Sequence, residues 1–292
     1  MKAPEISPAC IACNSTATRR RWQRKHRMIW RCETCGLLFV FPQPNVETAH
    51  SSFQSTYFAG ASSASARLDL EFDQWRRPAL GLISNILKEQ KNQGRLLDVG
   101  CAGGALFDFF CDGSWTLVGV EPSRLAYERA KARFSDKLNV TLHNMYLTDI
   151  ALSNDGFDVI TVLESLYYMP TPQHDLKVIQ GLLKSDGVLA IEIPSFQYQR
   201  LWRTGILSYM LHRDWCTLTQ SHISFFSDRS LAALLAHSGL KIVGRIPIPS
   251  SVYGSSWQRF AQETYFAGMR TLFYASFRNL NLAPRTLYLC KR

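Results

Sequence analysis

The sequence predicts an α/β protein, in which a small cysteine-bearing ribbon precedes an open, mainly parallel sheet with helices on both faces. Three observations predict this fold class. From about residue 93 onward, short apolar runs alternate with helix-like segments, as in βαβ units. One run, Phe157–Leu163, is almost continuously apolar, which is typical of a strand buried on both faces. Two Cys-x-x-Cys pairs, Cys10/Cys13 and Cys32/Cys35, stand in front of this region.

The secondary structure follows from apolar periodicity and turn residues. A helix is expected over 67–91 with a start or a break near Pro78, because proline lacks the N–H that a helix interior needs. The strand-like run Leu37–Phe41 is ended by Pro42 and Pro44. In the main region we expect strands at 95–99, 116–120, 139–142, 157–163, 188–193, 240–245 and 286–290, and helices at 105–111, 123–134, 174–183 and 230–238.

Composition restricts the class of protein. The 292 residues suit one large domain with a small appendage or two modest domains. The net charge is +10, and residues 1–36 supply +6 of it through eight Lys/Arg against two acids. This basic segment favours an anionic partner such as nucleic acid, a phosphorylated substrate or a membrane surface, or it is a solvated basic hairpin. Without an apolar leader or a run of 18 apolar residues, we expect a cytoplasmic protein with no membrane span.

A glycine-rich turn follows the first strand of the sheet region, where the segment from Asp98 to Gly104 reads DVGCAGG. Glycines let the backbone approach a ligand, and a following helix offers free N–H groups. Glu121 ends the next strand, where a carboxylate can bind both ribose hydroxyls. A dinucleotide fold would need glycine at Ala102 and Ala105, which disfavours a nucleotide-dependent oxidoreductase. An acid at position 98 would repel a pyrophosphate, whereas it suits the cationic methionine end of S-adenosylmethionine.

The DVGCAGG segment resembles the first motif of class I S-adenosylmethionine-dependent methyltransferases, which reads roughly D-x-G-C-G-x-G. The likeness covers roughly 95–245, through segments at Gly119–Ser123, Phe157–Ile160, Leu182–Leu189, His222–Ser227 and Leu231–Leu240. It implies a Rossmann-like sheet that binds S-adenosylmethionine. The residues implied for the cofactor are Asp98, Gly100, Cys101 and Gly104 at the methionine end, Glu121 at the ribose, Met145 or Tyr146 at the adenine edge, and Glu164 at the methionine amine or as a salt-bridged rim residue.

The chain departs from that family pattern in ways that affect the chemistry. Ala102 replaces the usual middle glycine, which narrows the turn. Tyr167 and Tyr168 stand where many relatives carry Glu-His, so they are expected to shape the acceptor pocket or donate hydrogen bonds. No Asn/Asp-Pro-Pro-Tyr or Pro-Cys motif is present, which argues against methylation of nucleobases. His222 is the first choice for a catalytic base, with a structural turn-capping role as the alternative and His212 as a weaker candidate.

The four N-terminal cysteines have the spacing of a zinc site, since two Cys-x-x-Cys knuckles 18 residues apart supply four thiolates in a tetrahedral shell. Such a shell leaves no open position, so the predicted zinc is structural. The stretch Cys32–Pro44, followed by Tyr57-Phe58, resembles the zinc ribbon that precedes some class I methyltransferases, including bacterial sugar C-methyltransferases. The remaining cysteines lack this spacing and are expected in the core or as incidental thiols: Cys101, Cys111, Cys216 and Cys290.

Together these features predict a zinc ribbon at 1–45, a linker with leading helices at 46–92, a cofactor-binding domain at 93–245 and an extension at 246–292 that completes the sheet or the acceptor side. The leading hypothesis is methyl transfer to a small molecule, such as a sugar or a glycan or lipid precursor. The alternatives are an RNA methyltransferase whose basic ribbon holds phosphates, and a non-catalytic zinc-ribbon binding protein. The sequence leaves open the acceptor, the methylated atom and the oligomeric state.

Two aromatic and basic stretches have alternative interpretations. The stretch at 196–215 is read as a lid over the acceptor or as an amphipathic surface helix that touches a membrane. For the stretch at 257–277, packing in the core is the default expectation, and peripheral membrane contact is the alternative.

Overall fold

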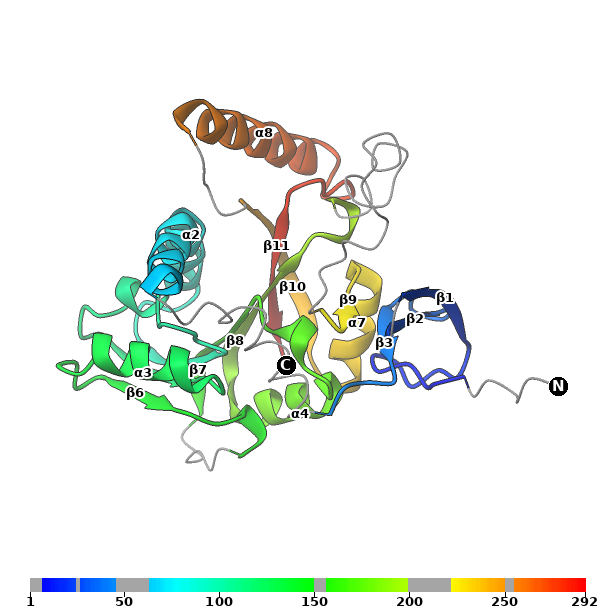
Figure 1. Cartoon of the computed structure of the whole chain (residues 1–292), viewed down its shortest axis with the longest axis horizontal. Helices are drawn as coiled ribbons and strands as arrows, with labels where there is room; N and C mark the ends of the chain where they lie inside the picture. Colours follow the sequence, from blue (N-terminus) through cyan, green and yellow to red (C-terminus); the bar gives the residue numbers. More distant parts are fainter. Residues whose placement is uncertain (1–6, 25–26, 46–62, 150–155, 199–221, 250–254) are drawn as a thin grey trace.

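A computed structural model describes residues 7–24, 27–45, 63–149, 156–198, 222–249 and 255–292 of the chain (Figure 1). The main sheet is built from β4 (Gly94–Val99), β5 (Trp115–Val120), β6 (Val140–His143), β7 (Phe157–Leu163), β8 (Leu183–Pro194), β10 (Lys241–Ile248) and β11 (Arg285–Lys291). Its strand order is β10-β11-β8-β7-β4-β5-β6. The strands from β8 to β6 in this order are parallel, and β11 is antiparallel to both of its neighbours. This confirms the predicted open α/β sheet.

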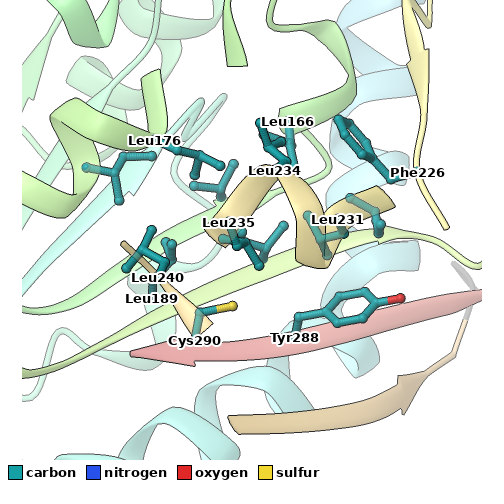
Figure 2. Packing of buried hydrophobic residues seen from close by; sticks show 14 of the residues in the cluster. Leu166, Leu176, Leu189, Phe226, Leu231, Leu234, Leu235, Leu240, Tyr288 and Cys290 are labelled. Atoms are coloured by element: carbon teal, nitrogen blue, oxygen red, sulfur yellow. The ribbon is translucent and has the colours of Figure 1, made fainter. Parts of the chain in front are cut away.

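Helices cover both faces of the sheet, because its parallel strands are apolar on both sides. One face packs against α4 (Pro172–Leu182) and α7 (Asp228–His237), where Leu176, Leu231 and Leu235 meet residues of β8 and β11 (Figure 2). The other face packs against α2 (Ser63–Gln90), which contributes Ile83 and Leu87. The helix α3 (Arg124–Arg133) begins at Ser123, whose hydroxyl accepts a hydrogen bond from a backbone N–H in the first turn.

The helix expected over 105–111 is wrong. The structure has only a 3-10 turn, η1 (Phe107–Phe109), at this place. Gly104 before it and Gly113 after it both have positive φ, so the segment between them is short. Phe107 and Phe110 are fully buried, and their packing fixes this segment as a compact turn that contains no α-helix.

The predicted start or break at Pro78 is also wrong, because α2 runs through this residue from Ser63 to Gln90. A proline inside a helix costs about 3 kcal/mol. Leu80, Ile83 and Leu87 beyond it are buried against the sheet, and this packing offsets the lost hydrogen bond.

A second sheet joins the cysteine region to the main domain. It is built from β1 (Thr18–Arg24), β2 (Arg27–Cys32), β3 (Leu38–Phe41) and β9 (Ser224–Phe225), in that order. The strand β9 comes from the far C-terminal side of the chain and pairs with β3 (Figure 1). The Val40 N–H also donates to the Ile223 carbonyl over 2.9 Å. Trp30 and Phe39 belong to the same buried cluster as Leu166 of the main domain, so the ribbon packs directly on the sheet domain.

The C-terminal aromatic stretch forms α8 (Ser256–Ala275), which lies away from the sheet layers in Figure 1. The expectation of core packing is wrong for most of its large side chains. Trp257 and Phe260 are 71% and 70% exposed, whereas Phe273 is buried. The stretch expected over 196–215 lies largely outside the described residues, as do His212 and Cys216. No helix within the described ranges is long and apolar enough to cross a membrane.

Candidate active site

The glycine turn lies at the carboxyl end of β4, and its glycines are required by the local geometry. Gly100 and Gly104 both have φ of +77°, a conformation that side-chain-bearing residues rarely adopt. A Cβ at Gly104 would lie 2.5 Å from the Phe134 ring, and one at Gly100 would lie 3.0 Å from the Ser165 side chain. The sulfur-bearing side chain of Cys101, between these glycines, is buried. Side chains of Phe134 and Ser165 therefore pack closely against the turn and leave no room for a Cβ at either glycine.

Ala102, the departure from the family motif, also has a positive φ, of +48°. Its N–H donates to Glu121 Oε2 over 2.9 Å. The other oxygen of the same carboxylate, Oε1, accepts from the Ser123 N–H over 2.7 Å. Glu121 thus clamps the turn after β4 to the start of α3, in addition to the ribose role expected for it.

Two buried carboxylates flank the turn from neighbouring strands. Asp98 on β4 and Glu121 at the end of β5 are only 4% and 5% exposed. Burial raises the pKa of Asp98 to about 6, although the Thr161 hydroxyl donates to it over 2.7 Å. Burial likewise raises the pKa of Glu121 to about 7, against the effect of its two backbone N–H bonds. A cationic ligand at this turn would be attracted to both groups and would favour their ionised forms.

The expected adenine-edge residues lie in the loop after β6, which leads into η2 (Leu147–Asp149). Met145 and Tyr146 are both half-buried there. The neighbouring Asn144 side-chain amide donates to the Glu121 carbonyl over 2.8 Å. This bond holds the loop after β6 against the end of β5. Met145 and Tyr146 therefore lie at the same edge of the sheet as Glu121.

Glu164 follows β7 and belongs to an ion cluster that sequence reasoning missed. Its Oε2 lies 3.3 Å from Arg285 Nη2 and accepts a hydrogen bond from the Tyr167 hydroxyl over 2.9 Å. Behind it, Arg76 of α2 donates to both carboxylate oxygens of Glu192, over 3.0 and 2.6 Å. Burial raises the pKa of Glu164. Burial would do the same for Glu192, but the attraction of Arg76 holds its pKa below the ordinary value.

One signal in the sequence points to this cluster. Glu192 is a lone acid in the apolar run Val188–Ile193, and a buried carboxylate requires a cationic partner. Its partners stand on α2 and β11, at Arg76 and Arg285, and nothing in the local sequence identifies them.

His222 is buried among aromatic rings just before β9. Its ring centroid lies 3.9 Å from that of Tyr167, 5.2 Å from that of Tyr168 and 5.9 Å from that of Phe225. Tyr167 and Tyr168 belong to the turn η3 (Leu166–Tyr168), and the Ile223 N–H donates to the Tyr167 carbonyl over 3.0 Å. The structure therefore brings His222 together with both tyrosines on the Glu164 side of the glycine turn.

The four N-terminal cysteines do come together. Their sulfur atoms all lie within 4.8 Å of one another, with 3.6 Å between Cys10 and Cys35 and 3.5 Å between Cys13 and Cys32. A tetrahedral zinc with bonds of about 2.3 Å would place its sulfur ligands about 3.8 Å apart. The N–H groups of Ala12 and Cys35 point at Cys10 and Cys32 sulfurs over 3.4 Å in each case. Donor set and spacing both fit zinc.

Comparison with known proteins gives the family. A sequence profile described as "Methyltransferase domain" matches residues 72–244, which is more than half of the chain. Curated relatives include ubiquinone biosynthesis O-methyltransferases, one from Actinobacillus pleuropneumoniae serotype 5b (32% identity over 111 residues, 35% of this chain and 47% of the relative) and one from Bartonella tribocorum (24% over 168 residues, 56% and 67%). The chain thus spans about half the length of the first of these relatives.

Solved structures show the same fold at low sequence identity. A 1,6-didemethyltoxoflavin-N1-methyltransferase from Burkholderia thailandensis aligns with a TM-score of 0.54 at 13% identity, covering 93% of this chain and 97% of that one. An S-adenosylmethionine-dependent methyltransferase from Leishmania major aligns with a TM-score of 0.53 at 14% identity, covering 84% of both chains. With the family profile spanning much of the sheet and its glycine turn, the chain belongs to the methyltransferase-domain family.

Proposed function

We propose that the chain transfers a methyl group to a small-molecule acceptor, such as a sugar or a glycan or lipid precursor, at the carboxyl edge of the sheet. The observation that carries this proposal is the pair of buried acids, Asp98 and Glu121, on either side of the glycine turn. In the proposed arrangement, Asp98, Gly100, Cys101 and Gly104 hold the methionine end of S-adenosylmethionine, Glu121 holds the ribose, and Met145 or Tyr146 contacts the adenine edge. The names of the ubiquinone and toxoflavin relatives support a small acceptor.

S-adenosylmethionine supplies an electrophilic methyl group on a cationic sulfur. The residues of this chain must align an acceptor with that group and, for a hydroxyl, remove its proton. His222 is the proposed base, because it is held beside Tyr167 on the side of the turn away from Glu121. For a hydroxyl acceptor the step balances as follows. The acceptor oxygen would form a bond to the methyl carbon, the bond between that carbon and the sulfur would break, and His222 would take up the hydroxyl proton.

Calorimetry with S-adenosylhomocysteine, followed by transfer of labelled methyl groups to a panel of sugars and small hydroxyl compounds, tests this proposal. We expect one binding site for the nucleoside and labelled product with at least one acceptor class. Absence of nucleoside binding would overturn the assignment of the turn. Binding followed by transfer only to RNA would overturn the choice of acceptor.

A second acceptor class, RNA, is favoured by one specific feature of the ribbon. Arg19 on β1 and Arg31 on β2 are exposed and directly opposite each other, and Arg21 is exposed close by. Like charges in a cross-strand pair repel each other unless an anion lies between them. If RNA is the acceptor, RNA binding measured by gel shift will weaken steeply as the salt concentration rises, and the Arg19→Gln/Arg31→Gln variant will no longer bind RNA.

The cysteine cluster is proposed to hold one structural zinc ion, with Cys10, Cys13, Cys32 and Cys35 as its ligands. Peripheral contact with a membrane is proposed for the exposed face of α8, where Trp257 and Phe260 point to solvent. Failure of the purified protein to float with anionic liposomes would count against that contact.

A further inference from the structure

The ion cluster at the end of β7 consists of two pairs with different properties. The inner pair, Arg76 and Glu192, is closed: two hydrogen bonds join the guanidinium to the carboxylate, and their side chains are only 7% and 0% exposed. The outer pair, Glu164 and Arg285, retains 23% and 17% exposure. The outer pair therefore keeps some contact with solvent, while the inner pair is closed off behind it.

The outer pair has unused hydrogen-bonding capacity. Among the described residues, neither Glu164 Oε1 nor Arg285 Nη1 has a hydrogen-bond partner, although both atoms are buried. Glu164 Oε2, in contrast, accepts a hydrogen bond from the Tyr167 hydroxyl and forms an ion pair with Arg285. Buried polar atoms without partners are uncommon in folded proteins, and each one calls for an explanation such as a bound water, an ion or a functional role.

The charge of the cluster restricts what such a ligand can be. Two arginines face two glutamates, so the four groups are already balanced. A carboxylate or phosphate would bind Arg285 but be repelled by Glu164, and an ammonium group would meet the reverse problem. A neutral hydroxyl satisfies both atoms, because it donates to a carboxylate oxygen and accepts from a guanidinium N–H.

The position of the pair separates it from the proposed nucleoside site. Arg285 begins β11, three strands from β4 in the sheet order and about 14 Å away at the usual strand spacing. Asp98 and Glu121 lie on β4 and at the end of β5, towards the opposite edge. Glu164 is next to Ser165, whose side chain borders the Gly100 turn. The pair thus flanks the methyl-donor turn on the side away from the ribose-binding acid.

Resting on the proposed function, we propose that Glu164 and Arg285 form the acceptor subsite and bind a hydroxyl group of a neutral, hydroxyl-bearing acceptor. Glu164 accepts the hydrogen bond of that hydroxyl, and Arg285 donates to its oxygen. Tyr167 positions the carboxylate through its bond to Oε2. The positive φ of Glu164, +58°, is consistent with a site that holds this residue in a strained conformation.

The test compares Glu164→Gln and Arg285→Lys with a matched control, Lys184→Gln, which breaks the partly exposed ion pair to Asp158 near the amino ends of β7 and β8. Folding is checked by thermal unfolding, and either site variant suffices if the other does not fold. Catechol and methyl glucoside serve as neutral hydroxyl probes. We expect S-adenosylhomocysteine affinity within about 3-fold of wild type in all three variants, and a KM for the methylated probe raised about 10-fold in the site variants only.

Three outcomes are informative. A loss of S-adenosylhomocysteine affinity of about 10-fold in either site variant would mean that the pair holds the methionine group of the cofactor, which overturns the acceptor assignment. Nucleoside binding by the wild type without transfer to either probe would overturn the hydroxyl assignment. Absence of nucleoside binding by the wild type would instead overturn the proposed function itself, so the two failures are distinguishable.

Discussion

The two sides of the glycine turn contrast in how they treat buried carboxylates. On the side of β4 and β5, Asp98 and Glu121 are held by a threonine hydroxyl and by backbone N–H groups. On the side of β7, β8 and β11, Glu164 and Glu192 are paired with arginines. Neutral donors leave the first pair of acids with a residual attraction for a cation, whereas ion pairing neutralises the second pair.

This difference in charge is the basis on which we propose complementary tasks for the two sides of the carboxyl edge. In the arrangement proposed above, the first side binds a positively charged sulfur nucleoside, and the second binds a neutral acceptor. Within the described ranges, the pairing of β3 with β9 next to His222 joins the ribbon to the second side. Changes to the ribbon and to the arginines should therefore affect the acceptor side and leave cofactor binding intact.

The largest effect is expected from removal of the proposed metal. Cys35→Ser should abolish zinc binding, because a three-thiolate site loses the closed tetrahedral shell, and the ribbon should lose its fold. Zinc content by elemental analysis should fall from about one ion per chain to nearly none. S-adenosylhomocysteine affinity should stay within about 3-fold, since the cofactor side lies elsewhere. A loss of S-adenosylhomocysteine affinity well beyond 3-fold would contradict the separation of the two sides. Cys111→Ser, at a half-buried thiol outside the cluster, is the control.

The next effect concerns the closed ion pair. Arg76→Ala leaves Glu192 buried without its bidentate partner, and breaking a buried pair in this way costs about 3–5 kcal/mol of the free energy of unfolding. Lys184→Gln breaks a partly exposed pair and should cost less than about 1 kcal/mol. Urea unfolding of both variants measures this difference. Equal losses would show that the Arg76 pair is not part of the support of the site.

Asp98→Asn sharpens the comparison from the cofactor side. The substitution keeps the shape but removes a negative charge near the proposed sulfonium, so S-adenosylmethionine affinity should fall about 10-fold or more, equivalent to about 1.4 kcal/mol. Thr161→Val, which removes only the hydroxyl that donates to Asp98, should have a smaller effect. Calorimetry gives both values, and unchanged binding by the asparagine variant would remove the electrostatic basis of the assignment.

The raised pKa values predict a pH dependence with a definite sign. Glu121 has a pKa of about 7 in the folded chain against 4.5 as its ordinary value, so folding favours its neutral form. Its contribution to stability is present below about pH 4.5 and is lost as pH rises through about 7. A cationic nucleoside prefers the ionised acid, so its affinity should increase several-fold over the same rise. Titrations at pH 5.5 and 8 measure this trend, and Glu121→Gln should flatten it.

The smallest effect is expected at the turn itself. Ala102→Gly relieves the positive φ of an alanine, but it also makes the unfolded chain more flexible. The two terms nearly cancel, so the free energy of unfolding should change by less than about 1 kcal/mol. Gly104→Ala is the contrasting control, since its Cβ would lie 2.5 Å from the Phe134 ring and destabilise the fold clearly. Equal effects of both substitutions in chemical denaturation would argue against this view of the turn.

The parts of the fold that depend on local pattern could be predicted from the residues alone. The run Phe157–Leu163 predicted a buried strand, because a strand covered on both faces of a parallel sheet is apolar at nearly every position. The strand β7 has the same bounds. The glycine turn, the acid at Glu121 and the two cysteine pairs were likewise readable, since backbone freedom and ligand spacing are local properties.

Features that depend on partners far apart in the chain became visible only in the folded arrangement. Arg76 meets Glu192 across 116 positions of the chain, and Arg285 reaches Glu164 from the last strand. The two-residue strand β9 exists because β3 offers it an edge, and the helix expected over 105–111 fails because Phe107 and Phe110 are drawn into the core. Ion pairing and packing are set by which elements the fold brings together, and that information is not contained in any short segment.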